Sequence, residues 1–277
     1  MSYKIVSDSS SNLLKTDLVP FSSVPLKVIT ATNEYIDDSN LDVQKMVSDL
    51  EKYKGTSKTA CPNVDEWFKA FEDYDNIFCV TITSSLSGSY NSACIALEDY
   101  LQKNPGKKGY VIDTLSVGPE STLIIEKLCE LIKQELDFKE IKEAIIQYQK
   151  STRLIFCLDS LRNLANNGRV SPAVAKIAGV LGIRIVGKAS LKGTLEITNK
   201  TRGSSNAITT VFKNMIKEGY SGGKLHIHHC QNLKAASALE SMVKAVFPKS
   251  DIILKETGAL CSFYAESGGL LVGFEGN

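Results

Sequence analysis

A run of small hydroxyl residues, Thr83–Ala93 (TSSLSGSYNSA), has the residue types best suited to holding an anion. It follows an apolar strand-like run, Ile77–Ile82, and leads into a helical pattern over Tyr90–Leu101. A strand–turn–helix with small residues at the turn points backbone N–H groups at whatever docks there, and the helix dipole favours negative charge. The stretch therefore suggests capture of a carboxylate or phosphate, with Ser87 and Ser89 adding hydroxyls. The alternative is that these serines only cap the helix.

Ser87 also has the chemistry of a nucleophile, but the first glycine of a GxSxG turn is missing. A serine hydrolase needs a histidine, and the chain has only His226, His228 and His229, all in one strand-like run. In a strand His226 and His228 would face one side and His229 the other. Two of them could share a metal ion, yet nothing nearby completes a ligand set with familiar spacing. A structural role for the histidines is therefore favoured over a metal site.

Two further stretches carry polar residues at turns. Lys58–Asn63 (KTACPN) is a proline-broken loop in which Thr59 offers a hydroxyl, although an ordinary Ser/Thr turn explains it equally well. In Leu158–Pro172, an Asn-Gly pair ends one helix and a Ser-Pro pair starts the next, which leaves Arg169 on the connecting turn. An arginine at this turn has a functional role only if it pairs with a bound anion.

The composition argues against several classes of function. A net charge of +1 gives no electrostatic reason to bind nucleic acid, and membrane contact is expected to be peripheral or transient at most. The beginning of the chain lacks a signal-peptide pattern, and no stretch has the length and purity of a transmembrane helix. The seven cysteines are scattered and include no CxxC pair, which argues against a zinc site or a disulfide framework. We therefore expect a cytoplasmic protein.

The first half of the chain alternates strands and helices. The expected strands are Tyr3–Ser7, Val24–Ile29, Ile77–Ile82 and Tyr110–Ile112, and the expected helices are Leu41–Tyr53 (capped by Asn40), Asp65–Tyr74, Tyr90–Leu101, Ser121–Glu135 and Phe138–Lys150. Repeated units of this kind predict a parallel sheet covered by helices on both faces.

The second half of the chain arranges its strands and helices differently. Its expected strands are Leu154–Leu158, Ile183–Gly187, Thr194–Lys200, Lys224–His229, Ile252–Lys255 and Leu270–Phe274, and its expected helices are Pro172–Leu181, Ser204–Glu218 and Leu233–Phe247. Strands joined directly, as across the turn Ser190–Gly193, imply antiparallel pairing and a mixed sheet. We place a domain boundary near residue 150, giving domains 1–150 and 151–277. Without a Pro/Gly/Ser-rich linker the two should pack tightly, and ligands favour such junctions.

Three of these stretches together resemble the DegV family, the lipid-binding proteins that include the fatty-acid-binding subunits of bacterial fatty acid kinase. That family carries a T-S-x-P-S loop, an S-x-L-S-G-T-Y turn and an S-L-x-x-L-x-x-x-G-R-I segment in this order. Here they stand as Thr59–Asn63 (TACPN), Ser84–Tyr90 (SSLSGSY) and Ser160–Val170 (SLRNLANNGRV). Asp8–Leu13 (DSSSNL) also resembles the family's opening, so the resemblance spans essentially the whole chain.

The resemblance implies an α/β fold of two domains, an N-terminal three-layer domain with a parallel sheet and a C-terminal domain with a mixed sheet. A long-chain fatty acid such as palmitate would lie in a tunnel between them. By position, Thr59 and Ser87 would hydrogen-bond the carboxylate, assisted by the backbone at Gly88 and Ser89. Arg169 would lie near the exit and help engage a partner kinase. The resemblance implies no catalytic residue, no metal and no cofactor besides the bound fatty acid.

Two departures from the family pattern bear on handling of a phosphate more than on lipid binding. The second loop residue, often a serine, is Ala60 here. A histidine that the family often carries near the carboxylate is absent from Ala259–Gly269, which leaves open whether Tyr264 takes its place.

Physical reasoning favours a lipid over a small polar anion. Each buried methylene contributes about 0.8 kcal/mol, so a long acyl chain supplies on the order of 10 kcal/mol before ordering costs. The head group then needs only a few hydroxyls and amides, and we expect a polar cup without lysine or arginine. The favoured function is a non-catalytic carrier that presents the carboxyl group to a separate kinase. The alternatives are a serine-dependent acyl hydrolase and a lipid sensor without a kinase partner.

Overall fold

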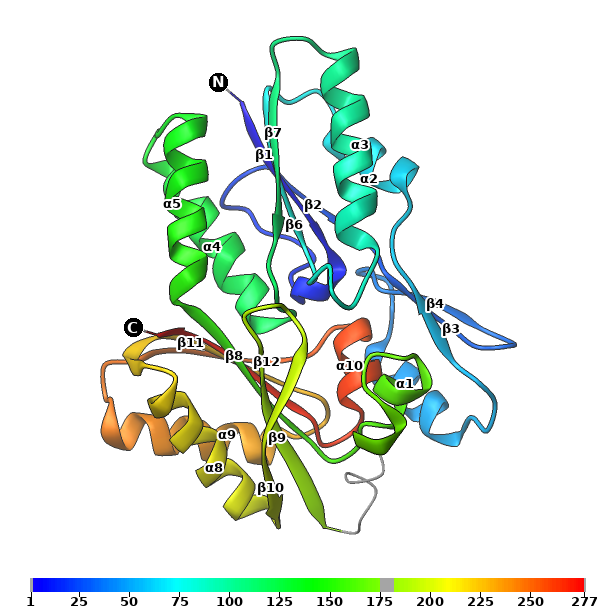
Figure 1. The fold of residues 1–277 in the computed structure, drawn as a ribbon, viewed down its shortest axis with the longest axis vertical. Helices are drawn as coiled ribbons and strands as arrows, with labels where there is room; N and C mark the ends of the chain where they lie inside the picture. The colour runs from blue at the N-terminus through cyan, green and yellow to red at the C-terminus, as the bar shows by residue number, and fades with distance from the viewer. Residues whose placement is uncertain (1, 175–181, 277) are drawn as a thin grey trace.

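Two large sheets form the frame of the molecule (Figure 1). The computed structural model describes residues 2–174 and 182–276. Strands from the first half of the chain build a sheet in the upper part of the view, and strands from Thr152 onwards build a second sheet in the lower part. Helix α4 (Pro119–Lys133) lies between them and contacts strands of both sheets.

The upper sheet is entirely parallel, with the order β2-β1-β6-β7. Its strands are β1 (Tyr3–Asp8), β2 (Phe21–Val24), β6 (Asn76–Thr81) and β7 (Lys108–Asp113). Because side chains alternate along a strand, Ile5 and Phe78 pack against α4 and α5 (Phe138–Ser151). Their neighbours Val6 and Ile77 pack on the other face, against α2 (Val64–Phe71) and α3 (Ser89–Lys103). The prediction of a parallel sheet covered on both faces is confirmed.

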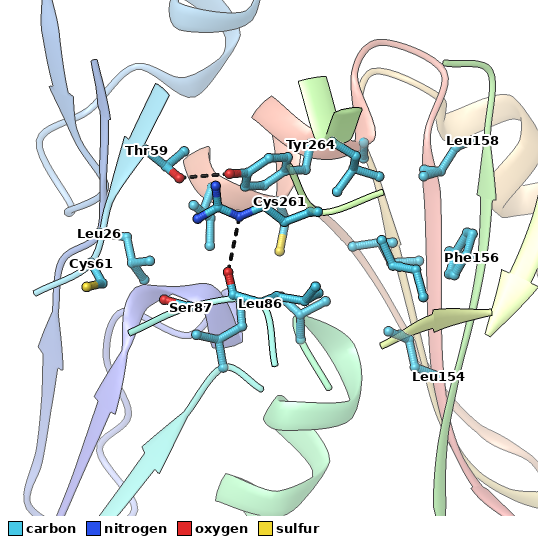
Figure 2. Close-up of a pocket in the computed structure, with 18 of the residues that line it drawn as sticks. Leu26, Thr59, Cys61, Leu86, Ser87, Leu154, Phe156, Leu158, Cys261 and Tyr264 are labelled. Atoms are coloured by element: carbon cyan, nitrogen blue, oxygen red, sulfur yellow. Dashed lines mark hydrogen bonds between the residues drawn. The ribbon is translucent and has the colours of Figure 1, made fainter. Parts of the chain in front are cut away.

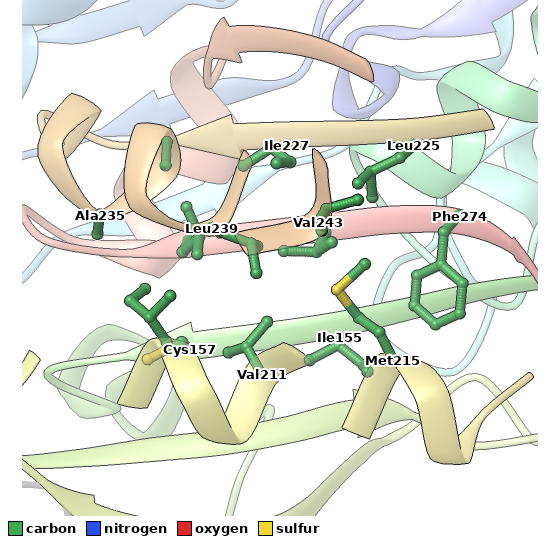
Figure 3. Close-up of a cluster of buried hydrophobic side chains, with 14 of the residues drawn as sticks. Ile155, Cys157, Val211, Met215, Leu225, Ile227, Ala235, Leu239, Val243 and Phe274 are labelled. Carbon is green, nitrogen blue, oxygen red and sulfur yellow. The ribbon is translucent and has the colours of Figure 1, made fainter. Parts of the chain in front are cut away.

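The lower sheet is mixed, as predicted, with the order β10-β9-β8-β13-β11-β12. Its strands are β8 (Thr152–Leu158), β9 (Ile183–Ala189), β10 (Leu195–Arg202), β11 (Tyr220–His229), β12 (Asp251–Glu256) and β13 (Leu270–Gly276). β11 and β12 run parallel, and the other neighbouring pairs run antiparallel. Helices α8 (Ser204–Lys217) and α9 (Leu233–Val246) cover one face with a closed apolar cluster (Figure 3). The opposite face is turned towards α4 and α10 (Ala259–Ala265).

A third, three-stranded antiparallel sheet corrects one sequence-based expectation. Its strands, in the order β4-β3-β5, are β3 (Lys27–Ile29), β4 (Glu34–Ile36) and β5 (Lys58–Ala60). The expected strand Val24–Ile29 is wrong as a single element, because β2 ends at Val24 and the chain resumes in the small sheet at Lys27. Pro25 has no N–H to continue a ladder, which explains the break. β5 also places Thr59 on a strand and not in a loop.

Several helix ends differ from expectation. The cap of α1 (Val43–Lys52) is Asp42, whose side chain accepts a hydrogen bond from the Lys45 N–H at 2.9 Å, and not Asn40. Helix α10 has no counterpart among the expected elements, because seven residues are too few for a periodic signal. The short helix α6 (Arg162–Asn166) precedes the expected Asn-Gly stop. The expected helix Pro172–Leu181 falls mostly outside the described residues.

The chain passes from the upper to the lower sheet where α5 ends at Ser151 and β8 begins at Thr152. The expected boundary near residue 150 therefore separates the two large sheets in chain order. In space the division is less sharp, since Val28 and Met46 pack in one cluster with side chains of β8 and α10. The division into domains 1–150 and 151–277 stays a prediction.

Candidate functional site

A cavity of about 320 Å³ lies between the two large sheets (Figure 2). β8 supplies one wall through Leu154, Phe156 and Leu158, which point away from the cluster under α8 and α9. The other apolar lining residues are Leu26, Ala60, Cys61, Ile82, Leu86, Val117, Leu164, Leu195, Leu260, Cys261, Ala265 and Leu271. The volume falls in the range of small-molecule sites, about 300–1,000 Å³. Side chains do not fill the junction.

Polar groups gather on the side of the cavity away from β8 (Figure 2). Thr59 on β5 and Tyr264 on α10 share a hydrogen bond of 2.8 Å between their hydroxyl oxygens. Ser87 and Gly88 come from the turn that precedes α3, and Arg169 follows α6. The structure thus brings Thr59 and Ser87 to one cavity, as expected, and adds Tyr264 to them.

A buried carboxyl group holds the hydroxyl turn in place. Asp8, the last residue of β1, accepts hydrogen bonds from the Ile82 N–H at 2.9 Å and from the Ser89 hydroxyl at 2.6 Å. Burial raises the pKa of Asp8, and its hydrogen bonds, including one from the Ser10 hydroxyl, act in the opposite direction. Because Ile82 and Ser89 stand before and after the turn, Asp8 fixes both of its ends.

In the sequence, Asp8 stands out only by its place in the DSSSNL segment. The signal for it is an acidic residue at the carboxyl end of a buried parallel strand. The carboxyl ends of such strands meet at one edge of the sheet, where ligands bind.

The four residues expected to meet a carboxylate do not all line the cavity. Thr59, Ser87 and Gly88 do, whereas Ser89 lies behind them, with its hydroxyl bonded to Asp8 and its N–H donating to Ser87 Oγ at 3.3 Å. Gly88 is the N-cap of α3, and a Cβ there would meet Sγ of Cys61 at 3.3 Å. Ser89 therefore supports Ser87 and does not itself face the cavity.

Arg169 also lines the cavity, which corrects the expectation of a polar cup without charge. Its Nε donates to the Leu86 carbonyl oxygen at 3.1 Å (Figure 2), and its Nη1 donates to the Asn167 carbonyl oxygen. The preceding Gly168 has φ +75°, a conformation that glycine adopts readily. A guanidinium held in this way can pair with an anionic head group.

Burial keeps two titratable groups of the cavity lining, Tyr264 and Cys261, in their protonated, neutral forms. Burial raises the pKa of Tyr264, and the opposing effects of the Thr59 hydrogen bond and the Arg169 charge are smaller. The phenol therefore keeps its proton. Burial also raises the pKa of Cys261, so this residue is a thiol and not a reactive thiolate.

The histidines lie away from Ser87. His226 Nε2 is 3.1 Å from a Glu126 carboxylate oxygen, and His228 Nδ1 is 2.9 Å from Asn12 Nδ2. Their ring centroids are 5.8 Å apart, which agrees with the expectation that they share one side of the strand. None of His226, His228 and His229 is among the described residues that line the cavity, so none of them is placed to activate Ser87.

Within residues 2–174 and 182–276, no group of three or more His, Cys, Asp or Glu side chains is placed to hold a metal ion. No helix in these same ranges is both long enough and apolar enough to cross a membrane. All seven cysteines are free.

Comparison with known proteins places this geometry in a family. A family model described as "Uncharacterised protein, DegV family" matches residues 2–275. A DegV domain-containing protein of Streptococcus pneumoniae is 43% identical over 279 residues, which cover 99% of each chain. A DegV family protein from Eubacterium eligens, crystallised loaded with heptadecanoic acid, is 42% identical with a TM-score of 0.97 over 100% of both chains. The Fatty Acid Kinase (Fak) B3 protein of Streptococcus pneumoniae, loaded with linoleic acid, is 42% identical with a TM-score of 0.98, again over 100% of both chains. The resemblance seen in the three motifs is confirmed, and the chain belongs to the DegV family.

Proposed function

We propose that this chain binds one long-chain fatty acid in the cavity between its sheets and presents the carboxyl group to a separate kinase, without catalysing a reaction itself. The observation that carries the proposal is one cavity with an apolar wall and a polar side, which Thr59 and Ser87 both line. The proteins loaded with heptadecanoic and linoleic acid share this fold over their full length, which supports the choice of ligand.

The apolar wall accounts for most of the binding energy. An acyl chain laid against Leu154, Phe156 and Leu158 is removed from water, and each buried methylene contributes about 0.8 kcal/mol. A long chain therefore supplies on the order of 10 kcal/mol before the cost of ordering it. A short polar anion would leave this wall unused.

The polar side then has to compensate a buried carboxylate. The hydroxyls of Thr59 and Ser87 and the N–H of Gly88 are the donors we assign to it, and an unpaired buried charge would be costly. The first N–H groups of α3 have no partner within the helix, so they add favourable dipoles. Arg169 supplies a positive charge beside this cup.

Arg169 is also the residue we assign to the exit and to the kinase. It is only partly buried, and its hydrogen bonds to backbone carbonyls hold the guanidinium at the edge of the cavity. The kinase partner is supported by the name of the Streptococcus pneumoniae neighbour, a fatty acid kinase protein.

Extraction of the purified protein with organic solvent, followed by mass spectrometry, should release a long-chain fatty acid.

Thr59→Val and Ser87→Ala should each weaken binding of palmitic acid about 10- to 100-fold, since a hydrogen bond to a charged group contributes roughly 1.5–3 kcal/mol. Thr56→Val, an exposed threonine outside the cavity, is the matched control and should bind normally. Unchanged affinity in both cavity variants would refute the assignment of the carboxylate site.

A second experiment tests the kinase role. With a bacterial fatty acid kinase catalytic subunit and ATP, the loaded wild-type protein should yield acyl phosphate, and Arg169→Ala should yield much less while still carrying lipid. A wild-type protein that binds lipid but yields no acyl phosphate would instead indicate a sensor. Hydrolysis of acyl esters that Ser87→Ala abolishes would indicate a hydrolase.

A further inference from the structure

A second cavity of about 420 Å³ adjoins the first, and Leu154 lines both. Along β8 the first cavity is lined by Leu158, Phe156 and Leu154, and the second by Leu154, Arg153 and Thr152, of which Leu154 and Thr152 continue the alternation of the first three residues. Alternate residues of a strand share one face, with about 6.6 Å between them. The two cavities therefore follow one another along the same face of β8, with Leu154 at their junction.

The second cavity has an apolar part suited to the end of a hydrocarbon chain. Its apolar lining residues are Leu115, Ile146, Leu154, Ala189 and Leu191. Its polar lining includes Glu120 and the cations Lys150 and Arg153. A carboxyl oxygen of Glu120 accepts a hydrogen bond from the Thr152 hydroxyl at 2.8 Å. Leu191 is 90% exposed, so the cavity reaches the surface at this residue.

Backbone of α4 lies close to the junction on the side of β13. Leu154 pairs with Gly273 of β13, and a Cβ on Gly273 would meet the Glu120 nitrogen at 2.5 Å. The start of α4 thus lies directly on the strand beside Leu154. The Leu154 side chain, itself 3% exposed, lies between the two cavities and lines both of them.

We propose that Leu154 determines the length of acyl chain that this protein accepts. The inference rests on the proposed function, in which the carboxylate lies near Thr59 and Ser87 and the chain runs towards β8 (Figure 2). Chains that fit in the first cavity end before Leu154. Longer chains must displace this side chain to place their tails in the second cavity.

The test measures dissociation constants of the delipidated protein for saturated fatty acids from lauric to lignoceric acid. In wild type, affinity should rise with length and then fall. Leu154→Ala should join the cavities and improve binding of behenic relative to palmitic acid by about tenfold or more, since two further buried methylenes contribute roughly 1.6 kcal/mol. Leu154→Phe should move the preference towards shorter chains.

Leu239→Ala is the matched control, because it removes the same atoms from the cluster under α8 and α9, which borders neither cavity. It should leave unchanged the length at which affinity falls. If Leu154→Ala unfolds, Leu154→Phe still tests the inference in the opposite direction. A length profile equal to that of wild type in every folded Leu154 variant overturns the role of Leu154, whereas a wild-type protein that binds none of these acids overturns the proposed function itself.

Discussion

Ile155 and Cys157 point from one face of β8 into a closed cluster with α8 and α9 (Figure 3), whereas Leu154, Phe156 and Leu158 point from the other face towards a cavity (Figure 2). All five side chains are only 1–3% exposed. The two faces are therefore alike in residue type and in exclusion of water. Burial by itself does not distinguish a filled core from the wall of a binding site.

The difference lies in what stands opposite each face. Helices α8 and α9 bring Val211 and Leu239 down onto the strand and fill the space (Figure 3). Opposite the other face stand the hydroxyl turn, which Asp8 holds by hydrogen bonds, and α10, whose first N–H groups donate to Asp37. Collapse into the cavity would break these buried hydrogen bonds, so the hollow persists.

The largest expected effect tests whether the two faces differ in packing. Leu239→Ala should lower the free energy of unfolding by about 2–5 kcal/mol, because it opens a cavity in a filled cluster. Leu158→Ala should cost only about 1–2 kcal/mol in the lipid-free protein, because that side chain already lacks partners on one side. Urea denaturation of both variants measures the difference. Equal losses would mean that the two faces are packed alike.

A second prediction concerns the buried acid beside the cavity face of β8. Burial raises the pKa of Glu120 from 4.5 to about 7, so its contribution to stability is complete below pH 4.5 and is lost as the pH rises through 7. The shift corresponds to roughly 3 kcal/mol. Glu120→Gln should therefore be more stable than wild type by as much as ~3 kcal/mol near pH 8 and by little near pH 4.5. A difference that does not change with pH would contradict the buried, neutral carboxyl group.

Binding of lipid should stabilise the protein through the cavity face of β8 and not through the face under α8 and α9. At palmitic acid concentrations about 100-fold above Kd, the protein should gain roughly 2.7 kcal/mol. A chain of this size should then melt about 5 °C higher. Leu239→Ala should show the same gain as wild type, because its cluster does not border the cavity. Thermal denaturation with and without lipid checks both statements, and a smaller gain in this variant would couple the two faces.

The smallest effect concerns the junction of α4 with β11, away from both faces of β8. Burial holds the pKa of His228 well below 6.5, and the positive charge of Lys255 acts in the same direction. The neutral ring therefore stabilises the fold above pH 6.5, and this contribution falls by about 1.4 kcal/mol per unit as the pH drops below 6.5. His228→Gln should show a flatter dependence.

The informative quantity is the difference between His228→Gln and wild type in urea titrations from about pH 7 to pH 5. The buried acids Asp8 and Asp37 have raised pKa values and titrate with the opposite sign in both proteins. Parallel curves for the two proteins would show that His228 is not buried in its neutral form.

Much of the fold follows from local patterns in the chain. Apolar periodicity predicts both large sheets and most of the helices, because each element must turn an apolar face to a neighbour. The failures are short elements. The strands of the small sheet have three residues each, and helix α10 has seven. Elements this short show no apolar periodicity in the sequence. The break at Pro25 is visible in the sequence, but which sheet each half joins is not.

The site, too, follows only in part from the sequence. The sequence by itself determined the family through three ordered motifs, and it singled out Thr59, Ser87, Gly88 and Arg169, all of which line one cavity. Only the tertiary structure decided that Ser89 turns to Asp8, that Thr59 meets Tyr264 across 205 residues, and that the guanidinium of Arg169 borders the cup. These contacts join segments that are distant in the chain. Their geometry depends on how whole elements pack, which no local spacing of residues encodes.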